Sequence, residues 1–121
     1  MSTSDVLDPA AVAELRRVQE QFGNPEFIGE LVGLFRKNAP RRMSEIRAAL
    51  AARDGASLQR AAHTLKTNCA FVGAKGMAEA CARIEDAAGR GDFDAAAPAL
   101  TEAELLFPEV LAAVLELGAR G

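Results

Sequence analysis

The sequence is poor in several residue types, and each shortage excludes a class of protein. It has no Tyr and no Trp, and its two cysteines, Cys69 and Cys81, are too few for a disulfide scaffold. We expect both to be free thiols in a reducing cytoplasm. No apolar run approaches the roughly 18 residues of a membrane-spanning helix, and the acidic N-terminus does not have the form of a signal peptide. We therefore expect a cytoplasmic protein that inserts into no membrane.

Basic charge and histidine are also scarce. The net charge is −3, and the 14 basic residues form no block, so we do not expect nucleic-acid binding. The single histidine, His63, could join the two cysteines in a zinc site, but it stands six positions before Cys69, off helical register, which argues against this. We find no P-loop, no kinase glycine-rich loop and no acidic Mg²⁺ cluster. We therefore expect no metal, no cofactor and no ATP-binding kinase site.

The residues that are abundant favour helices. Half of the chain is apolar, alanine is common, and residues that favour strands are sparse. The length suits one domain, so we expect residues 1–121 to form a single domain. Apolar residues recur at helical spacing in five segments. The composition and the spacing together predict an all-α protein.

Capping residues and turn signals give the expected bounds of these segments. Asp8-Pro9 and Asn24-Pro25 each read as a helix cap followed by a first-turn proline, and Asp54 caps the third helix. The expected helices cover about residues 9–22, 25–53, 55–72, 75–88 and 93–117. In the fifth, the expected stripe consists of Phe93, Ala97, Leu100, Phe107, Leu111 and Val114. We expect residues 118–121 to fray.

The prolines and the short loops complete the expected fold. Pro40 should kink the second helix, and Pro108 should kink or divide the fifth. Short loops between long amphipathic helices favour antiparallel neighbours. The sequence therefore predicts an antiparallel up-down four-helix bundle over about residues 24–117, with a short extra helix at the N-terminus.

The third segment places His63 away from its apolar stripe. At about 100° per residue, five residues fall within about 40° of one direction and form the expected core stripe: Leu58, Ala62, Leu65, Cys69 and Val72. His63 lies about 140° from that direction, so we expect it to be exposed. Lys66, three residues on, can donate a hydrogen bond to an anion beside it. An exposed histidine is more often an ordinary surface residue, so geometry alone assigns it no function.

The stretch AAHTLKTNCAFVGAKGMAEACARIEDAAGRGD resembles the signature of histidine-containing phosphotransfer (HPt) domains. That signature has His-x-Leu-Lys, small residues, a Gly, a later Cys, and an acidic or amide residue one turn beyond. The matching positions are His63, Leu65, Lys66, Gly73, Cys81 and Glu85. The resemblance covers about residues 24–100. His-x-Leu-Lys alone would be weak, but the matched spacing as far as Cys81 is specific.

The resemblance implies a role for each matching position. His63 matches the histidine that accepts a phosphoryl group, and Lys66 matches the lysine that steadies this group. Glu85 matches the position on the next helix whose Glu or Gln bonds the other imidazole nitrogen. The family often has Gly directly after the lysine, where this chain has Thr67. We expect Thr67, with Ala70 further along the helix, to set how closely a partner approaches.

The expected function is that of a phosphoryl carrier rather than an enzyme. The resemblance implies that His63 relays a phosphoryl group between response-regulator receiver domains, a sensor histidine kinase, or both, in a two-component phosphorelay. We expect a monomer. Two alternatives stay open. One is a phosphoacceptor domain for a chemotaxis-type kinase, which Glu85 suits. The other is a bundle that binds a receiver or kinase without using His63.

Overall fold

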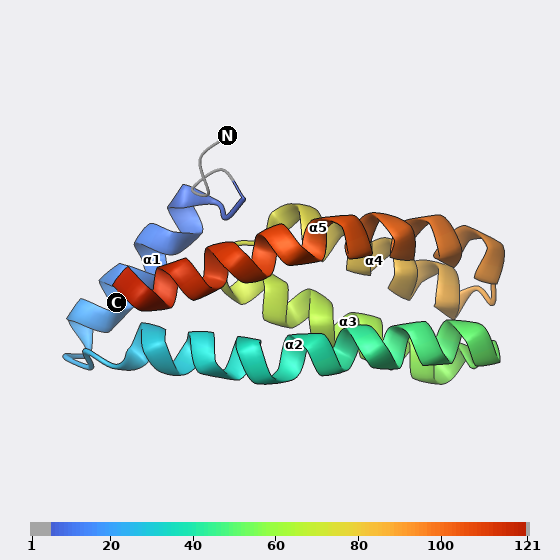
Figure 1. The fold of residues 1–121 in the computed structure, drawn as a ribbon, viewed down its shortest axis with the longest axis horizontal. Helices are drawn as coiled ribbons and strands as arrows, with labels where there is room; N and C mark the ends of the chain where they lie inside the picture. The colour runs from blue at the N-terminus through green and yellow to red at the C-terminus, as the bar shows by residue number, and fades with distance from the viewer. Residues whose placement is uncertain (1–5, 121) are drawn as a thin grey trace.

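The computed structural model describes residues 6–120 and places five helices in that range, with no strand. They are α1 (Pro9–Gln21), α2 (Phe27–Ala52), α3 (Gly55–Phe71), α4 (Lys75–Gly89) and α5 (Phe93–Arg120). Figure 1 shows α2 to α5 running in alternating directions, with α1 lying across one end. The predicted all-α, up-down four-helix bundle with a short extra N-terminal helix is confirmed.

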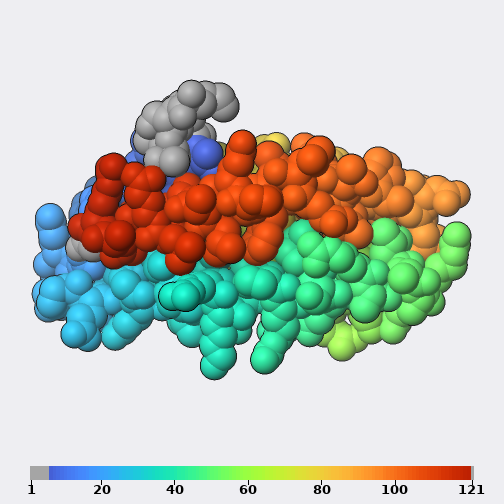
Figure 2. All heavy atoms as spheres, viewed as in Figure 1, coloured from blue at the N-terminus to red at the C-terminus, as the bar shows by residue number. Residues whose placement is uncertain are grey.

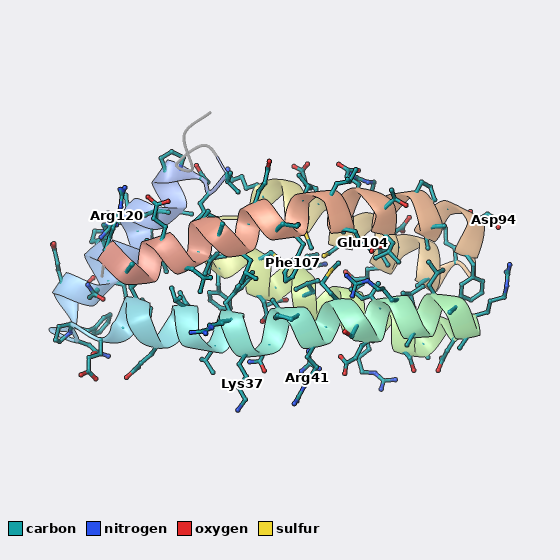
Figure 3. The ribbon with its side chains drawn as sticks, in the orientation of Figure 1. Lys37, Arg41, Asp94, Glu104, Phe107 and Arg120 are labelled. Carbon is teal, nitrogen blue, oxygen red and sulfur yellow. The ribbon has the colours of Figure 1, made fainter. Side chains whose placement is uncertain are left out.

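The order of packing fixes which helices are neighbours. α3 packs against α2 and α4, and α5 packs against the same two helices from the other side. α3 and α5 therefore occupy opposite corners of the bundle. Figure 3 shows Lys37 and Arg41 on the outer side of α2, away from α5. None of the helices within residues 6–120 is both long and apolar enough to span a bilayer.

Side-chain caps begin three of the helices, and two of these caps, Asp8 and Asp54, are predicted from the sequence. The Asp8 carboxylate accepts from the amide of Ala10 (3.3 Å) at α1, and Asp54 accepts from the amide of Ser57 (3.1 Å) at α3. Asp92 accepts from the amide of Ala95 (3.0 Å) at α5. The expected Asn24 cap is wrong. Its side chain accepts from the amide of residue 26 in a turn that precedes α2, because asparagine readily closes such turns.

Pro40 and Pro108 do not interrupt their helices. α2 continues through Pro40 and α5 through Pro108. Of the two outcomes expected at Pro108, a kink or a division, the division does not occur. Both prolines are exposed, where water can satisfy the carbonyl that each leaves without a partner. The expected fraying of the tail is also wrong up to Arg120, because Gly118 brings the last turns of α5 close to α2. A Cβ at residue 118 would lie 2.8 Å from a methyl carbon of Val32. Gly121 lies outside the described residues.

The core follows the predicted stripes with one exception. The five stripe residues of α3 are fully buried, as are Met77, Cys81 and Ile84 of α4. On α5, Ala97 is exposed, whereas Ala96 is buried. The expected stripe is therefore wrong at Ala97 alone, since Leu100 and Val114 are buried as predicted. Cys69 and Cys81 are free and buried. A hydrogen bond with Cys81, together with burial, raises the pKa of the Cys69 thiol, which makes it a packing group rather than a reactive one.

The start of α1 is fastened to the loop between α3 and α4. The amide of Asp8 donates to the carbonyl of Gly73 (2.8 Å), and the Asp8 carboxylate pairs with Lys75 (3.1 Å). Gly73 has a φ of +79°, and a Cβ there would lie 2.8 Å from the Cβ of Ala11. Glycine therefore meets two requirements at this position: a left-handed backbone and contact with α1.

Replacing Gly73 with alanine should lower the free energy of unfolding by about 2–3 kcal/mol, from left-handed strain and overpacking against α1. Gly23 is a matched control, because its φ is +60° but nothing lies within 4 Å of a Cβ built there. Gly23→Ala should cost only the backbone strain, about 1 kcal/mol. Urea unfolding of both variants measures the difference. Equal costs would show that α1 does not press on Gly73.

Candidate phosphoacceptor site

His63 projects from the exposed side of α3. Its side chain is 59% exposed, because the core stripe turns the opposite side of the helix inward. Thr67 and Ala70 are exposed on the same helix. The Thr67 hydroxyl donates to the carbonyl of His63 (3.2 Å). With its hydroxyl bonded to the backbone, Thr67 offers a partner mainly its methyl group.

Glu85 reaches this histidine from α4. One carboxylate oxygen, Oε2, lies 2.8 Å from Nδ1 of His63, and the other, Oε1, lies 2.6 Å from Nζ of Lys66. The Glu85 side chain is 21% exposed, so water screens both contacts only in part. The structure therefore brings His63, Lys66 and Glu85 together, and the carboxylate bridges the two α3 residues.

The carboxylate determines which imidazole nitrogen is free. The hydrogen bond from Lys66, followed by that from His63, lowers the pKa of Glu85 from its ordinary 4.5. Glu85 is therefore ionised at neutral pH and can only accept hydrogen bonds. Nδ1 must then carry the proton of a neutral imidazole, which leaves Nε2 with a lone pair. Because the side chain is exposed, that lone pair is the group that an incoming molecule meets.

The lowered pKa of Glu85 makes a prediction about stability. In the folded chain the pKa of Glu85 lies below the ordinary 4.5. The ionised Glu85 carboxylate therefore stabilises the fold at pH values above 4.5. This stabilisation is lost as the pH falls through the lowered pKa. Glu85→Gln should therefore be less stable than the wild type at about pH 7, and the difference should shrink as the pH falls below 4.5. Urea unfolding across this range measures it, and a gap that does not change with pH would contradict the assignment.

A shallow hollow adjoins the bridged carboxylate. It is lined in part by Gln59 and Lys66 of α3 and, on the α4 side, by Glu85, Gly89 and Arg90. A Cβ at residue 89 would lie 2.9 Å from Nε2 of Gln59, so a larger residue at 89 would push Gln59 aside. Sequence reasoning did not predict that Gln59 lines this hollow. It also missed the bond between Lys66 and Glu85, which depends on how α3 and α4 are placed relative to each other.

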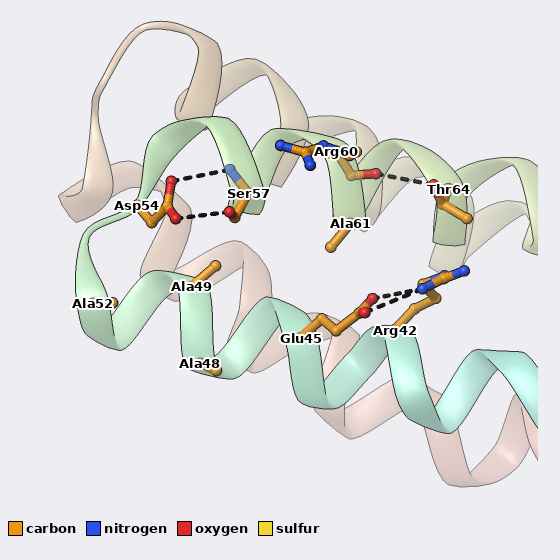
Figure 4. A pocket seen from close by; sticks show the side chains of 10 residues that line it. All are labelled: Arg42, Glu45, Ala48, Ala49, Ala52, Asp54, Ser57, Arg60, Ala61 and Thr64. Carbon is orange, nitrogen blue, oxygen red and sulfur yellow. Dashed lines mark hydrogen bonds and ion pairs between the residues drawn. The ribbon is translucent and has the colours of Figure 1, made fainter.

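A second hollow lies between α2 and α3, away from this chemistry. Figure 4 shows it bordered by Asp54, Ser57, Arg60 and Thr64 of the α3 side and by Arg42 and Glu45 of α2. Arg42 pairs with Glu45 at 2.8 Å. None of His63, Lys66 and Glu85 lines this hollow. Alanines of both helices also contribute to its lining: Ala48, Ala49, Ala52 and Ala61.

The described residues do not bring His63 and the two cysteines into a common site. Cys69 and Cys81 are in the core, whereas His63 is on the surface. Within residues 6–120 we find no group of three or more His, Cys, Asp or Glu side chains placed to hold a metal ion. The chemistry of this face is therefore that of an imidazole, a carboxylate and an ammonium group.

Comparisons with known proteins agree with this arrangement. The sequence model of the Hpt domain family matches residues 30–117. Histidine-containing phosphotransfer protein B (HptB) from Pseudomonas aeruginosa PAO1 is similar in structure, with a TM-score of 0.84 and 28% identity over 96% of each chain. The histidine-containing phosphotransfer protein ZmHP2 from maize has a TM-score of 0.83 and 27% identity, over 99% of this chain and 90% of its own. A search among curated protein sequences gives no significant match. The family match covers most of the chain, and the chain therefore belongs to the Hpt domain family.

Proposed function

We propose that this protein carries a phosphoryl group on Nε2 of His63 in a two-component phosphorelay. Membership of the Hpt domain family supports histidine phosphotransfer as the function. The observation that carries the assignment to one atom is the 2.8 Å contact between Nδ1 and Glu85, which leaves Nε2 free on an exposed side chain. His63, Lys66 and Glu85 come from one chain, so a monomer contains all three residues of the proposed site.

The transfer step follows from this geometry. The lone pair of Nε2 attacks the phosphorus of a receiver's aspartyl phosphate. The N–P bond forms as the bond between phosphorus and the aspartyl oxygen breaks, and the aspartate leaves as a carboxylate. The imidazole becomes positively charged as it gives up electron density. Glu85, fixed at Nδ1 before the reaction, stabilises that charge. The same step in reverse passes the phosphoryl group to a second receiver.

Lys66 contributes a second charge to the phosphorylated state. An ammonium group has three donors, and the bond with Glu85 at 2.6 Å uses one of them. The others are available for the oxygens of a phosphoryl group on the neighbouring His63, whose dianionic charge they would offset. Glu85 and the phosphoryl group would then both bond to this one lysine.

We also propose that Thr67 and Ala70 set how closely a receiver approaches His63. Thr67→Gly should change the relative rates of transfer from different receivers by about two- to tenfold. Thr64→Gly is the matched control, because the Thr64 hydroxyl also donates to a backbone carbonyl, that of Arg60 (3.0 Å), and both changes cost similar helix propensity. Equal rate profiles for the two variants, measured with labelled receivers, would show that Thr67 does not select partners.

The proposed partners are receiver domains and a sensor histidine kinase, and the phosphoryl chemistry starts on those partners. We propose that this protein is a carrier with no ATP-binding kinase site of its own. Its free cysteines are compatible with the reducing cytoplasm in which we place it.

Transfer profiling tests the proposed function. Wild-type protein is incubated with each phosphorylated receiver of the host, and separately with kinase cores and ATP. Efficient labelling by receivers supports the relay. Labelling only by a chemotaxis-type kinase core would instead make this chain the phosphoacceptor domain of such a kinase. No labelling by either, with binding retained, would make it a bundle that binds partners without phosphotransfer.

A further inference from the structure

The outer side of α5 carries an apolar stripe that the proposed function does not use. Its members are uncharged, exposed and spaced alternately four and three residues apart: Thr101, Leu105, Pro108, Ala112, Leu115 and Ala119. Leu105 is 74% and Leu115 38% exposed. The Thr101 hydroxyl donates to the carbonyl of Ala97 (3.2 Å), so it needs no further partner. We call this set the α5 outer stripe.

The opposite side of the same helix is buried in the core, as Val110, Val114 and Leu117 show. α5 is therefore apolar on two sides, whereas a surface helix of a bundle is normally polar on its outer side. The stripe runs for about 27 Å along the helix. Figure 2 shows α5, in orange and red, as an outer helix whose surface is open along most of its length. Alternating spacing of this kind is the pattern with which one helix packs against another.

Acidic residues border the stripe and indicate the charge of its partner. Glu102, Glu109 and Glu116 each directly follow a stripe residue, and Glu104 precedes Leu105 on the other edge. Glu102 pairs with Arg83, Glu104 with Arg47 and Glu116 with Arg120. Glu109 has no ion-pair partner among residues 6–120. A helix lying on the stripe would meet three glutamates along one edge and Glu104 on the other, so Lys or Arg beside its own apolar positions would complement them.

The same charges argue against a second copy of this chain. In an antiparallel pair of α5 helices the edge with Glu102, Glu109 and Glu116 would face itself. In a parallel pair it would face the edge that carries Glu104. Both arrangements place glutamate against glutamate, which disfavours self-association.

We propose that the α5 outer stripe is a docking surface for an amphipathic helix of another protein, with large aliphatic residues in its apolar stripe and Lys or Arg on both sides. Because α3 and α5 occupy opposite corners of the bundle, such a helix leaves His63 exposed. This chain could then be held by one partner while it exchanges a phosphoryl group with another.

Two labelled peptides of about three heptads each test the proposal by fluorescence anisotropy with the full chain. Both have Leu at the apolar positions, one with Lys and the other with Glu at the flanking positions. We expect the Lys peptide to bind and the Glu peptide not to bind. Leu105→Gln should weaken binding of the Lys peptide about tenfold or more. Leu34→Gln is the matched control, since Leu34 is 58% exposed on α2, and it should change nothing.

A charge reversal at Glu109 tests whether the peptide contacts the edge of the stripe that carries this glutamate. Glu109→Lys should weaken binding of the Lys peptide about two- to fivefold and strengthen that of the Glu peptide. Circular dichroism checks that each variant is folded. The proposal is overturned if neither peptide binds, or if Leu105→Gln binds as the wild type does. It is also overturned if sedimentation shows a wild-type dimer that Leu105→Gln converts to a monomer, because the occupant would then be a second copy.

Discussion

Replacing His63 with glutamine should abolish phosphoryl transfer to this protein. His63 is the only histidine of the chain, and Nε2 is the one imidazole nitrogen with a free lone pair. Glutamine is similar in length, but its amide nitrogen is not a nucleophile, so the reaction has no substitute acceptor. With a radiolabelled receiver as donor, we expect labelling of His63→Gln to fall below detection while the wild type is labelled within the same time.

The fold should be unaffected by this change. His63 is exposed and contributes nothing to the core, so helix content and binding of the receiver should stay close to those of the wild type. A folded His63→Gln variant that still takes up label would place the phosphoryl group on another residue. A variant that carries out the cellular function unlabelled would favour a role in binding alone.

Removing the Glu85 carboxylate gives the second large effect. Glu85→Ala should slow transfer to His63 about 10- to 100-fold, because the imidazole loses both the fixed orientation of Nδ1 and the charge that stabilises it during the reaction. Glu85→Gln should slow transfer less than Glu85→Ala does, because the glutamine amide oxygen can still accept a hydrogen bond from Nδ1 although the charge is gone. Rapid-quench measurements of the single-turnover rate check the order wild type, Gln, Ala.

The neighbouring acid provides the control. Asp86 follows Glu85 on α4 and pairs with Arg90 at 3.2 Å rather than with His63. Asp86→Ala should therefore leave the transfer rate within about twofold of the wild type. If Asp86→Ala slows transfer as much as Glu85→Ala does, the effect comes from the overall charge of α4 and not from the contact with Nδ1.

The sequence predicted α3 and α4 closely because local signals define them. The Asp54 cap and the regular apolar stripe set the start of α3 and its inward side, and the helical spacing of apolar residues set the bounds of α4. The exposure of His63 followed from the same periodicity. The roles of Lys66 and Glu85 came from the family resemblance, because helical spacing within one segment says nothing about which residues of another segment will face it.

Other features depend on contacts between distant segments and escaped prediction. The helical end of α5 depends on Gly118 packing against Val32, and the close approach of Ala11 to Gly73 depends on where α1 starts. The bond between Lys66 and Glu85 depends on how α3 and α4 cross. The continuation of α5 through Pro108 reflects tertiary packing on both sides of the proline, which outweighs the loss of one backbone hydrogen bond.

Glu85 is proposed to fix Nδ1 of His63 and thereby to make Nε2 the phosphoacceptor. Nitrogen-15 and phosphorus-31 NMR of the phosphorylated protein distinguish the two imidazole nitrogens directly. We expect a single phosphohistidine with phosphorus on Nε2 and a proton retained on Nδ1. Phosphorus on Nδ1, or on any residue other than His63, would contradict this assignment.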